Sequence, residues 1–112
     1  MRNVGGAVAV PELKMMQFAK AAPEARELRK AAGRWLQGLR KKAGLSQIQL
    51  AQTLGLKYYT FVSQVENGFG RVPSESLEAW ARALKIDPSE FARHLLSYYD
   101  HELHRLLFKE KP

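Results

Sequence analysis

The sequence LSQIQLAQTLGLKYYTFVSQVENG, residues 45–68, contains two short helical patterns separated by a glycine. In the first pattern, Ser46 is placed to cap a helix and Gly55 to end it. The apolar residues between them recur at helical spacing: Ile48, Leu50, Ala51 and Leu54. We therefore expect a short helix from Ser46 to about Leu54.

The second pattern begins near Lys57 and ends at Gly68, with Phe61, Val62 and Val65 available for packing. Two short helices joined by about four residues including a glycine, with polar side chains on the outer face of the second, are typical of a helix-turn-helix unit. In such a unit the first helix lies across the sugar-phosphate backbone of DNA and the second enters the major groove. The pattern therefore predicts a DNA-binding unit whose second helix reads the bases.

The flanking sequence predicts further helices. Residues 1–10 have no period and are expected to form a loose arm, followed by a short helix over residues 12–21. Pro23 suits the first turn of a new helix, which Gly44 would end. After the motif, Ser74 and Ser76 are candidate caps for a fourth helix. The dipeptide Asp87-Pro88 would open a long final helix.

The expected fold class is all-α: a compact five-helix bundle of the lambda-repressor-like type with an extra N-terminal segment and a long C-terminal helix. No alternating strand pattern, internal repeat or low-complexity tract argues against it. The expected organisation is an arm and short helix at residues 1–22, a DNA-binding domain at 23–87, and a C-terminal helix for dimerisation at 88–112.

The charge of the chain is concentrated around the motif. The 112 residues carry a formal net charge of +7. Residues 26–71 hold nine basic and two acidic residues, which alone gives +7. Such a segment is what a phosphate-binding surface requires. The absence of cysteine excludes disulfides and Cys-based zinc sites, and no apolar run is long enough to span a membrane. We expect a cytoplasmic, nucleoid-associated protein.

Three parts of the chain resemble the XRE or Cro/phage-repressor type of helix-turn-helix protein, over roughly residues 35–88. They are LRKKAGLSQIQLAQTLGL (residues 39–56), SQVENG (63–68), and Pro73 with LEAWARAL (77–84). The resemblance implies a bundle of about five helices that binds partly palindromic operators as a dimer. Between Gly55 and Gly68 the chain has one residue more than the usual pattern of the family. This leaves the register of residues 57–61 open, and a longer turn is one possible effect.

The candidate DNA contacts fall into three groups. Gln47 matches the family position whose side chain contacts a phosphate. Candidates for the groove face are Tyr58, Tyr59, Thr60, Ser63 and Gln64. Candidates for flanking phosphate contacts are Lys57, Asn67, Arg71 and Lys42, the last together with Arg40 and Lys41.

Three neighbouring positions carry expectations of their own. Adjacent residues of a helix point in different directions, so one of Tyr58 and Tyr59 is expected to face DNA and the other to pack inward. By the family match, Glu66 has a structural role, such as pairing with a nearby arginine.

A stripe at four-residue spacing on the final helix is the candidate dimer interface: Phe91, Leu95, Tyr99, Leu103 and Leu107. A two-fold interface there would set two recognition helices about 34 Å apart, as a palindromic site requires. Packing onto the first long helix is the alternative. His101 and His104 have metal-ligand spacing but no convincing third ligand, so neither a metal nor a cofactor is expected.

The expected function is sequence-specific binding of double-stranded DNA by a homodimeric transcription regulator, with repression as the expected sign. The alternative is an antitoxin-like interaction module that docks a protein partner through residues 8–22 and uses DNA binding for autoregulation. An enzyme is not expected, because the sequence has no phosphate loop, no zinc-protease motif and no convergent nucleophile and base.

Overall fold

The computed structural model of the protein describes residues 11–109, with side chains described from residue 24 onward. All regular secondary structure in this part of the chain is helical, which confirms the all-α class. The expected arm at residues 1–10 lies outside the described residues, as do the side chains of the proposed docking segment at residues 8–22. The elements are α2 (Pro11–Lys42), α3 (Gln47–Thr53), α4 (Thr60–Glu66), the 3-10 turn η1 (Ser74–Ser76), α5 (Leu77–Ala83), α6 (Pro88–Tyr99) and α7 (His101–Phe108).

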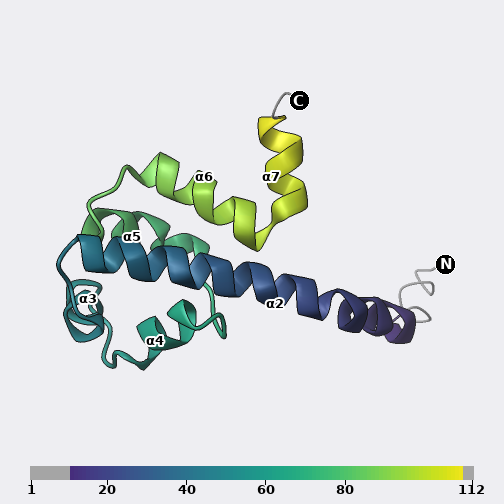
Figure 1. Ribbon diagram of the computed structural model, residues 1–112, viewed down its shortest axis with the longest axis horizontal. Coiled ribbons are helices and arrows are strands. Elements are labelled where there is room, and N and C mark those ends of the chain that lie inside the picture. Colours follow the sequence, from purple (N-terminus) through teal and green to yellow (C-terminus); the bar gives the residue numbers. More distant parts are fainter. Residues whose placement is uncertain (1–10, 110–112) are drawn as a thin grey trace.

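Helix α2 runs through the middle of the fold, with α3 and α4 below it and α6 and α7 above it in Figure 1. One apolar core joins the elements, and each of α2 to α6 contributes two fully buried side chains to it. The core residues are Ala32, Leu36, Leu50, Ala51, Val62, Val65, Val72, Trp80, Ala81, Leu84, Phe91 and Leu95. This core holds the two short helices α3 and α4, which are too short to be stable alone.

Helix α2 is continuous through Pro23, so there is no new helix start at that residue. A proline inside a helix removes one backbone hydrogen bond. The residues around it, KAAPEARE, are otherwise strong helix formers, which favours continuation on both sides. The helix ends at Lys42, and Gly44 has a left-handed φ of 77°, as its place after the last turn predicts.

Helix α3 has the predicted ends, and α4 does not. Ser46 caps α3 through a bond from the Gln49 amide, while the Gln49 side chain accepts from the Ser46 amide, at 3.0 and 2.8 Å. Gly55, with φ of 72°, lies in the turn. Helix α4 begins at Thr60 and not near Lys57. The turn is therefore longer than the four residues expected, in keeping with an extra residue in this segment.

The ends of α5 and α6 differ in how they are capped. Ser76 precedes α5 without a side-chain cap, and the backbone bond from the Leu77 amide to the Ser74 carbonyl takes its place. At α6, Asp87 accepts from the Glu90 amide at 3.0 Å with Pro88 in the first turn, as predicted.

The long final helix predicted from the sequence is in fact two helices that meet at Asp100. Its backbone leaves the helical region (φ −143°, ψ 72°), and its carboxylate caps α7 through the Leu103 amide at 3.3 Å. Aspartate competes for backbone amides in this way and therefore favours caps over helix interiors.

The break divides the expected interface stripe. Phe91 and Leu95 are fully buried in the chain's own core, Tyr99 is half-buried, and Leu103 and Leu107 are exposed. Phe91 and Leu95 therefore pack within the chain and are not available to a second copy.

Candidate nucleic-acid interface

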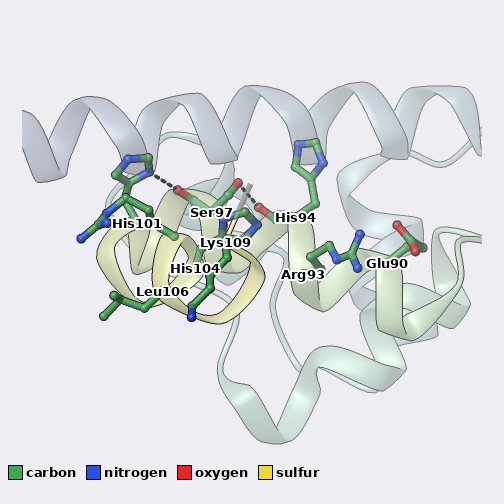
Figure 2. Close-up of a pocket in the computed structure, with 9 residues that line it drawn as sticks. Glu90, Arg93, His94, Ser97, His101, His104, Leu106 and Lys109 are labelled. Atoms are coloured by element: carbon green, nitrogen blue, oxygen red, sulfur yellow. Dashed lines mark hydrogen bonds between the residues drawn. The ribbon is translucent and has the colours of Figure 1, made fainter. Parts of the chain in front are cut away.

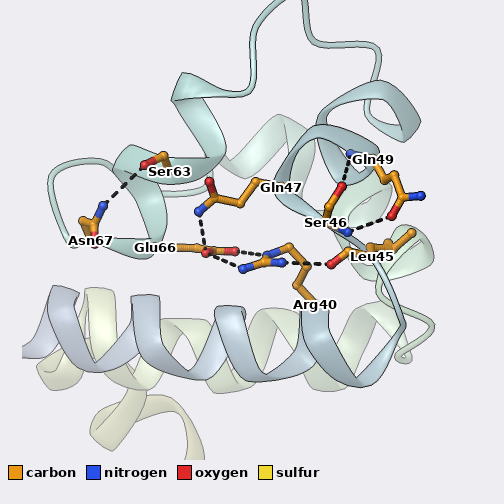
Figure 3. A network of polar contacts seen from close by, with 8 residues as sticks. All are labelled: Arg40, Leu45, Ser46, Gln47, Gln49, Ser63, Glu66 and Asn67. Carbon is orange, nitrogen blue, oxygen red and sulfur yellow. Dashed lines mark hydrogen bonds and ion pairs between the residues drawn. The ribbon is translucent and has the colours of Figure 1, made fainter.

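A buried polar network fixes the base of the helix-turn-helix unit (Figure 3). The Arg40 guanidinium donates two hydrogen bonds to the Glu66 carboxylate, from Nε to Oε2 at 2.6 Å and from Nη2 to Oε1 at 3.1 Å. Its Nη1 donates to the Leu45 carbonyl at 2.8 Å. Gln47 Nε2 donates to the same Glu66 Oε1 at 3.0 Å. One carboxylate thus links the end of α2, the start of α3 and the end of α4.

The network corrects one expectation and confirms another. Glu66 pairs with an arginine, as the family match suggested. Arg40 is that arginine, and both side chains are almost completely buried. Arg40 is therefore not a phosphate contact, whereas Lys41 and Lys42, grouped with it from the sequence, are exposed.

The same junction depends on close backbone approach between α2 and α4. Gly33 is buried, and a Cβ atom there would clash with the Glu66 carbonyl oxygen. Gly68, just after α4, has a φ of 84° and lies against Lys30. Only glycine allows both the approach and the turn. The end of α4 is thus held at a fixed distance from α2.

The start of α4 presents a row of exposed side chains. Lys57, Tyr58 and Tyr59 lie in the turn, Thr60 begins the helix and Gln64 follows one turn later; all are exposed. The Lys57 ammonium lies 5.6 Å from the centre of the Tyr58 ring. The structure thus brings five of the predicted contact residues to one end of the unit.

The expectation that one tyrosine packs inward is wrong. Tyr58 is 65% exposed and Tyr59 is 47% exposed. The expectation assumed helical geometry, in which neighbouring side chains point in different directions, but both residues precede the helix. Both tyrosines are therefore accessible at the start of α4.

The remaining predicted contacts lie farther along α4 and beyond it. Ser63 is half-buried, and its hydroxyl accepts from Asn67 Nδ2 at 3.4 Å. Arg71 is exposed, and its guanidinium carbon lies 4.5 Å from the centre of the Tyr99 ring. Tyr99 also accepts a hydrogen bond from the Val72 amide at 3.2 Å. Burial raises the pKa of the Tyr99 hydroxyl.

Sequence reasoning missed several features of this surface. Ile48, expected to pack, is 55% exposed on α3, and Phe69 is 77% exposed in the loop after α4. The glycines on both sides of Phe69 were an available signal for an exposed loop. The spacing of Ser46 and Gln49 is that of a capping box and could also have been recognised.

Two further findings concern alternative sites. Within residues 11–109, no helix is long and apolar enough to cross a membrane. Among the residues whose side chains are described, no group of three or more histidine, cysteine or acidic residues could hold a metal ion.

A family model described as helix-turn-helix matches residues 36–91, which is half of the chain. The matched segment runs from the second half of α2 to the start of α6 and contains the whole polar network. No protein of the curated collection matches the chain.

Proposed function

The chain belongs to the Cro/C1-type helix-turn-helix family of DNA-binding transcription regulators, and we propose that it represses transcription as a homodimer bound to a partly palindromic operator. Its place of action would be the nucleoid in the cytoplasm. The DNA-binding domain is assigned to residues 23–87 and dimerisation to the segment 88–112.

The observation that supports sequence reading is the exposed start of α4 on a rigid base. Gln64 is exposed on this helix, and a glutamine amide can form two hydrogen bonds to adenine. Thr60 can reach several base edges, while the hydroxyls of Tyr58 and Tyr59 are better suited to phosphate. Because Glu66 is held from α2 and α3 at once, α4 keeps one orientation when it meets DNA.

Phosphate contacts are assigned around this helix. Gln47 uses one amide hydrogen on Glu66, and its second amide hydrogen can donate to a phosphate oxygen. Lys42, Lys57 and Asn67 are exposed at the edges of the unit. Arg71 is assigned to the same role, with its guanidinium stacked on Tyr99.

The dimer contact is assigned to α7. Leu103, Leu106 and Leu107 are between 41% and 59% exposed, and a cluster of this kind on one short helix is typical of an interface. A self-complementary contact would place two copies of α4 about one DNA turn apart.

The test is selection from a random pool of duplex DNA by the purified chain at near-physiological salt, with the mass of the selected complex recorded. The proposal expects a reproducible inverted repeat bound by two chains. Weak, sequence-indifferent binding that disappears with salt would overturn it and would favour the antitoxin-like alternative, in which a protein partner is the main ligand.

Two variants distinguish contacts with the bases from contacts with the phosphates. Gln64→Ala is expected to change the preferred base at one position of each half-site, at a cost of about 1–3 kcal/mol. Lys42→Ala is expected to weaken binding equally for all sequences and to reduce the salt slope by about 1. If neither variant changes binding, the DNA face is assigned to the wrong surface.

A further inference from the structure

Helices α6 and α7 form an elbow at Asp100, and an open groove of about 860 Å³ lies between them (Figure 2). This volume suits a small organic molecule. Helices α6 and α7 lie across α2 from α3 and α4 in Figure 1, so DNA bound at α4 would not reach the groove between them. The helix-turn-helix function therefore leaves this groove without a role.

The lining of the groove is predominantly basic. It contains Arg93 from α6 and Arg105 and Lys109 from the α7 side, against the single carboxylate of Glu90. Arg105 is paired with Glu102 at 2.7 Å. Among the described residues, no ion pair engages Arg93 or Lys109. Both side chains are exposed, so a ligand that enters the groove can reach them.

Histidines complete the lining, and aromatic rings hold several of the groups in place. His94 stacks on Trp35, with ring centres 4.0 Å apart and planes at 7°. His104 lies 4.9 Å from Phe108, and the Arg93 guanidinium carbon lies 4.7 Å from the same phenylalanine ring. Groups that are already ordered lose less entropy on binding a ligand.

We propose that this groove binds a small phosphate-bearing organic anion, held by Arg93, Lys109 and the imidazole of His104. The planar guanidinium matches phosphate geometry, the lysine supplies a second positive charge, and imidazole N–H groups donate further hydrogen bonds. The ligand would contact both helices of the elbow at once.

Two of the three exposed leucines, Leu103 and Leu107, lie on a different face of α7 from the groove, whereas Leu106 lines the groove. At 100° per residue, His101, His104 and Arg105 share one face, while Leu103 and Leu107 lie on the opposite one. A bound anion would thus bridge α6 and α7 and leave Leu103 and Leu107 uncovered, while Leu106 lies at the groove. It would fix the direction in which the leucine face points, so that dimerisation and anion binding are linked if the proposed homodimer forms.

The test uses inorganic pyrophosphate as the probe, titrated into the full-length protein at constant ionic strength and followed by calorimetry and by backbone amide NMR shifts. Wild type is expected to show one saturable site, with the largest shifts at Arg93, His104 and Lys109. The groove variant Arg93→Gln with Lys109→Gln is expected to bind at least about tenfold more weakly.

A matched control removes the same charge elsewhere. Arg82→Gln with Lys85→Gln changes two exposed residues at α5, outside the groove, and is expected to change the affinity less than about twofold because distant exposed charges are screened. No saturable binding to wild type, or equal losses in both variants, would overturn the proposal. The groove variant is expected to select the same DNA sequence as wild type. Failure of the operator selection would therefore contradict the proposed function and not the anion site.

Discussion

The two sides of α2 are held by different kinds of contact. On the α4 side, a buried arginine–glutamate pair and the close approach at Gly33 connect the helices. On the α6 side, Trp35 stacks with Phe91 and His94, with ring centres 5.6 and 4.0 Å away. The directional contacts thus lie next to α4, and the aromatic contacts lie next to the C-terminal elbow.

The two kinds of contact contribute differently to the stability of the domain and to the orientation of its helices. Burial of an aromatic side chain contributes stability with little dependence on angle. A buried ion pair gains less, because desolvation of both charges offsets most of their attraction, but its paired hydrogen bonds allow only one geometry. We therefore expect the α6 side to dominate stability and the α4 side to dominate the precision of DNA reading.

The largest expected effect is on the aromatic side. Phe91→Ala should lower the free energy of unfolding by about 3–5 kcal/mol, because it removes a fully buried ring and leaves a cavity. Urea unfolding measures this change. Leu103→Ala, at an exposed position of α7, is the control and should cost less than about 1 kcal/mol in the monomer. Similar losses in the two variants would contradict the assignment of Phe91 to the core.

The second prediction concerns the buried ion pair between Arg40 and Glu66. Glu66→Gln should cost about 2–3 kcal/mol, because Arg40 keeps its charge in a buried site without a carboxylate. Arg40→Met combined with Glu66→Met should recover much of this loss, since no unpaired charge remains.

Operator selection with the double variant then separates stability from orientation. A folded double variant that binds DNA with reduced base preference is the expected result. Unchanged base preference would mean that the ion pair does not orient α4.

The third prediction compares two glycines of the same helix. Gly33→Ala should destabilise the protein by about 1–3 kcal/mol, because the new Cβ meets the Glu66 carbonyl. Gly38→Ala has no atom within 4 Å of the new Cβ and should stabilise α2 by about 0.5–1 kcal/mol. Thermal unfolding of both variants gives the comparison. If the unfolding temperature shifted in the same direction in both, the close approach at Gly33 would not be what excludes a side chain there.

The smallest expected effect concerns pH on the aromatic side. Burial against Trp35, and secondarily the nearby His104, lowers the pKa of His94 below its ordinary value of 6.5. Between the lowered value and 6.5, the unfolded chain binds more protons, so stability should fall as pH decreases through this range and then level off. The free energy of unfolding of His94→Gln, measured with urea, should fall less steeply than that of wild type between pH 7 and pH 5. Identical slopes of stability against pH in the two proteins would show that His94 does not cause the pH dependence.

Features set by local sequence were predictable. The cap at Ser46, the turn glycines and the Asp87-Pro88 start of α6 depend on residues within one helical turn, and their side-chain chemistry is sufficient to place them. The apolar spacing likewise indicated most of the core, but Ile48 is exposed and the buried Val72 was not indicated.

Features set by distant partners were not predictable. Arg40 cannot be told from Lys41 or Lys42 without Glu66, which lies 26 residues away. The exposure of Tyr58 and Tyr59 depends on where α4 begins, and the sequence left that register open. The break at Asp100 was hidden because the apolar stripe continues through it, although aspartate is a known cap. Local pattern therefore indicated that the fold is helical and placed several helix ends, while the site depended on tertiary contacts.

The contact of Tyr99 with Arg71 and Val72 has a consequence beyond packing. It ties the last residue of α6, one position before the elbow, to the loop that follows α4. A binding event that shifts the end of α6 would therefore also change the free energy of placing Arg71 on a phosphate. Thermodynamic reciprocity then requires that bound DNA alter the affinity of the elbow for its ligand by the same factor. Binding of the operator and binding of the elbow ligand would therefore each depend on the other.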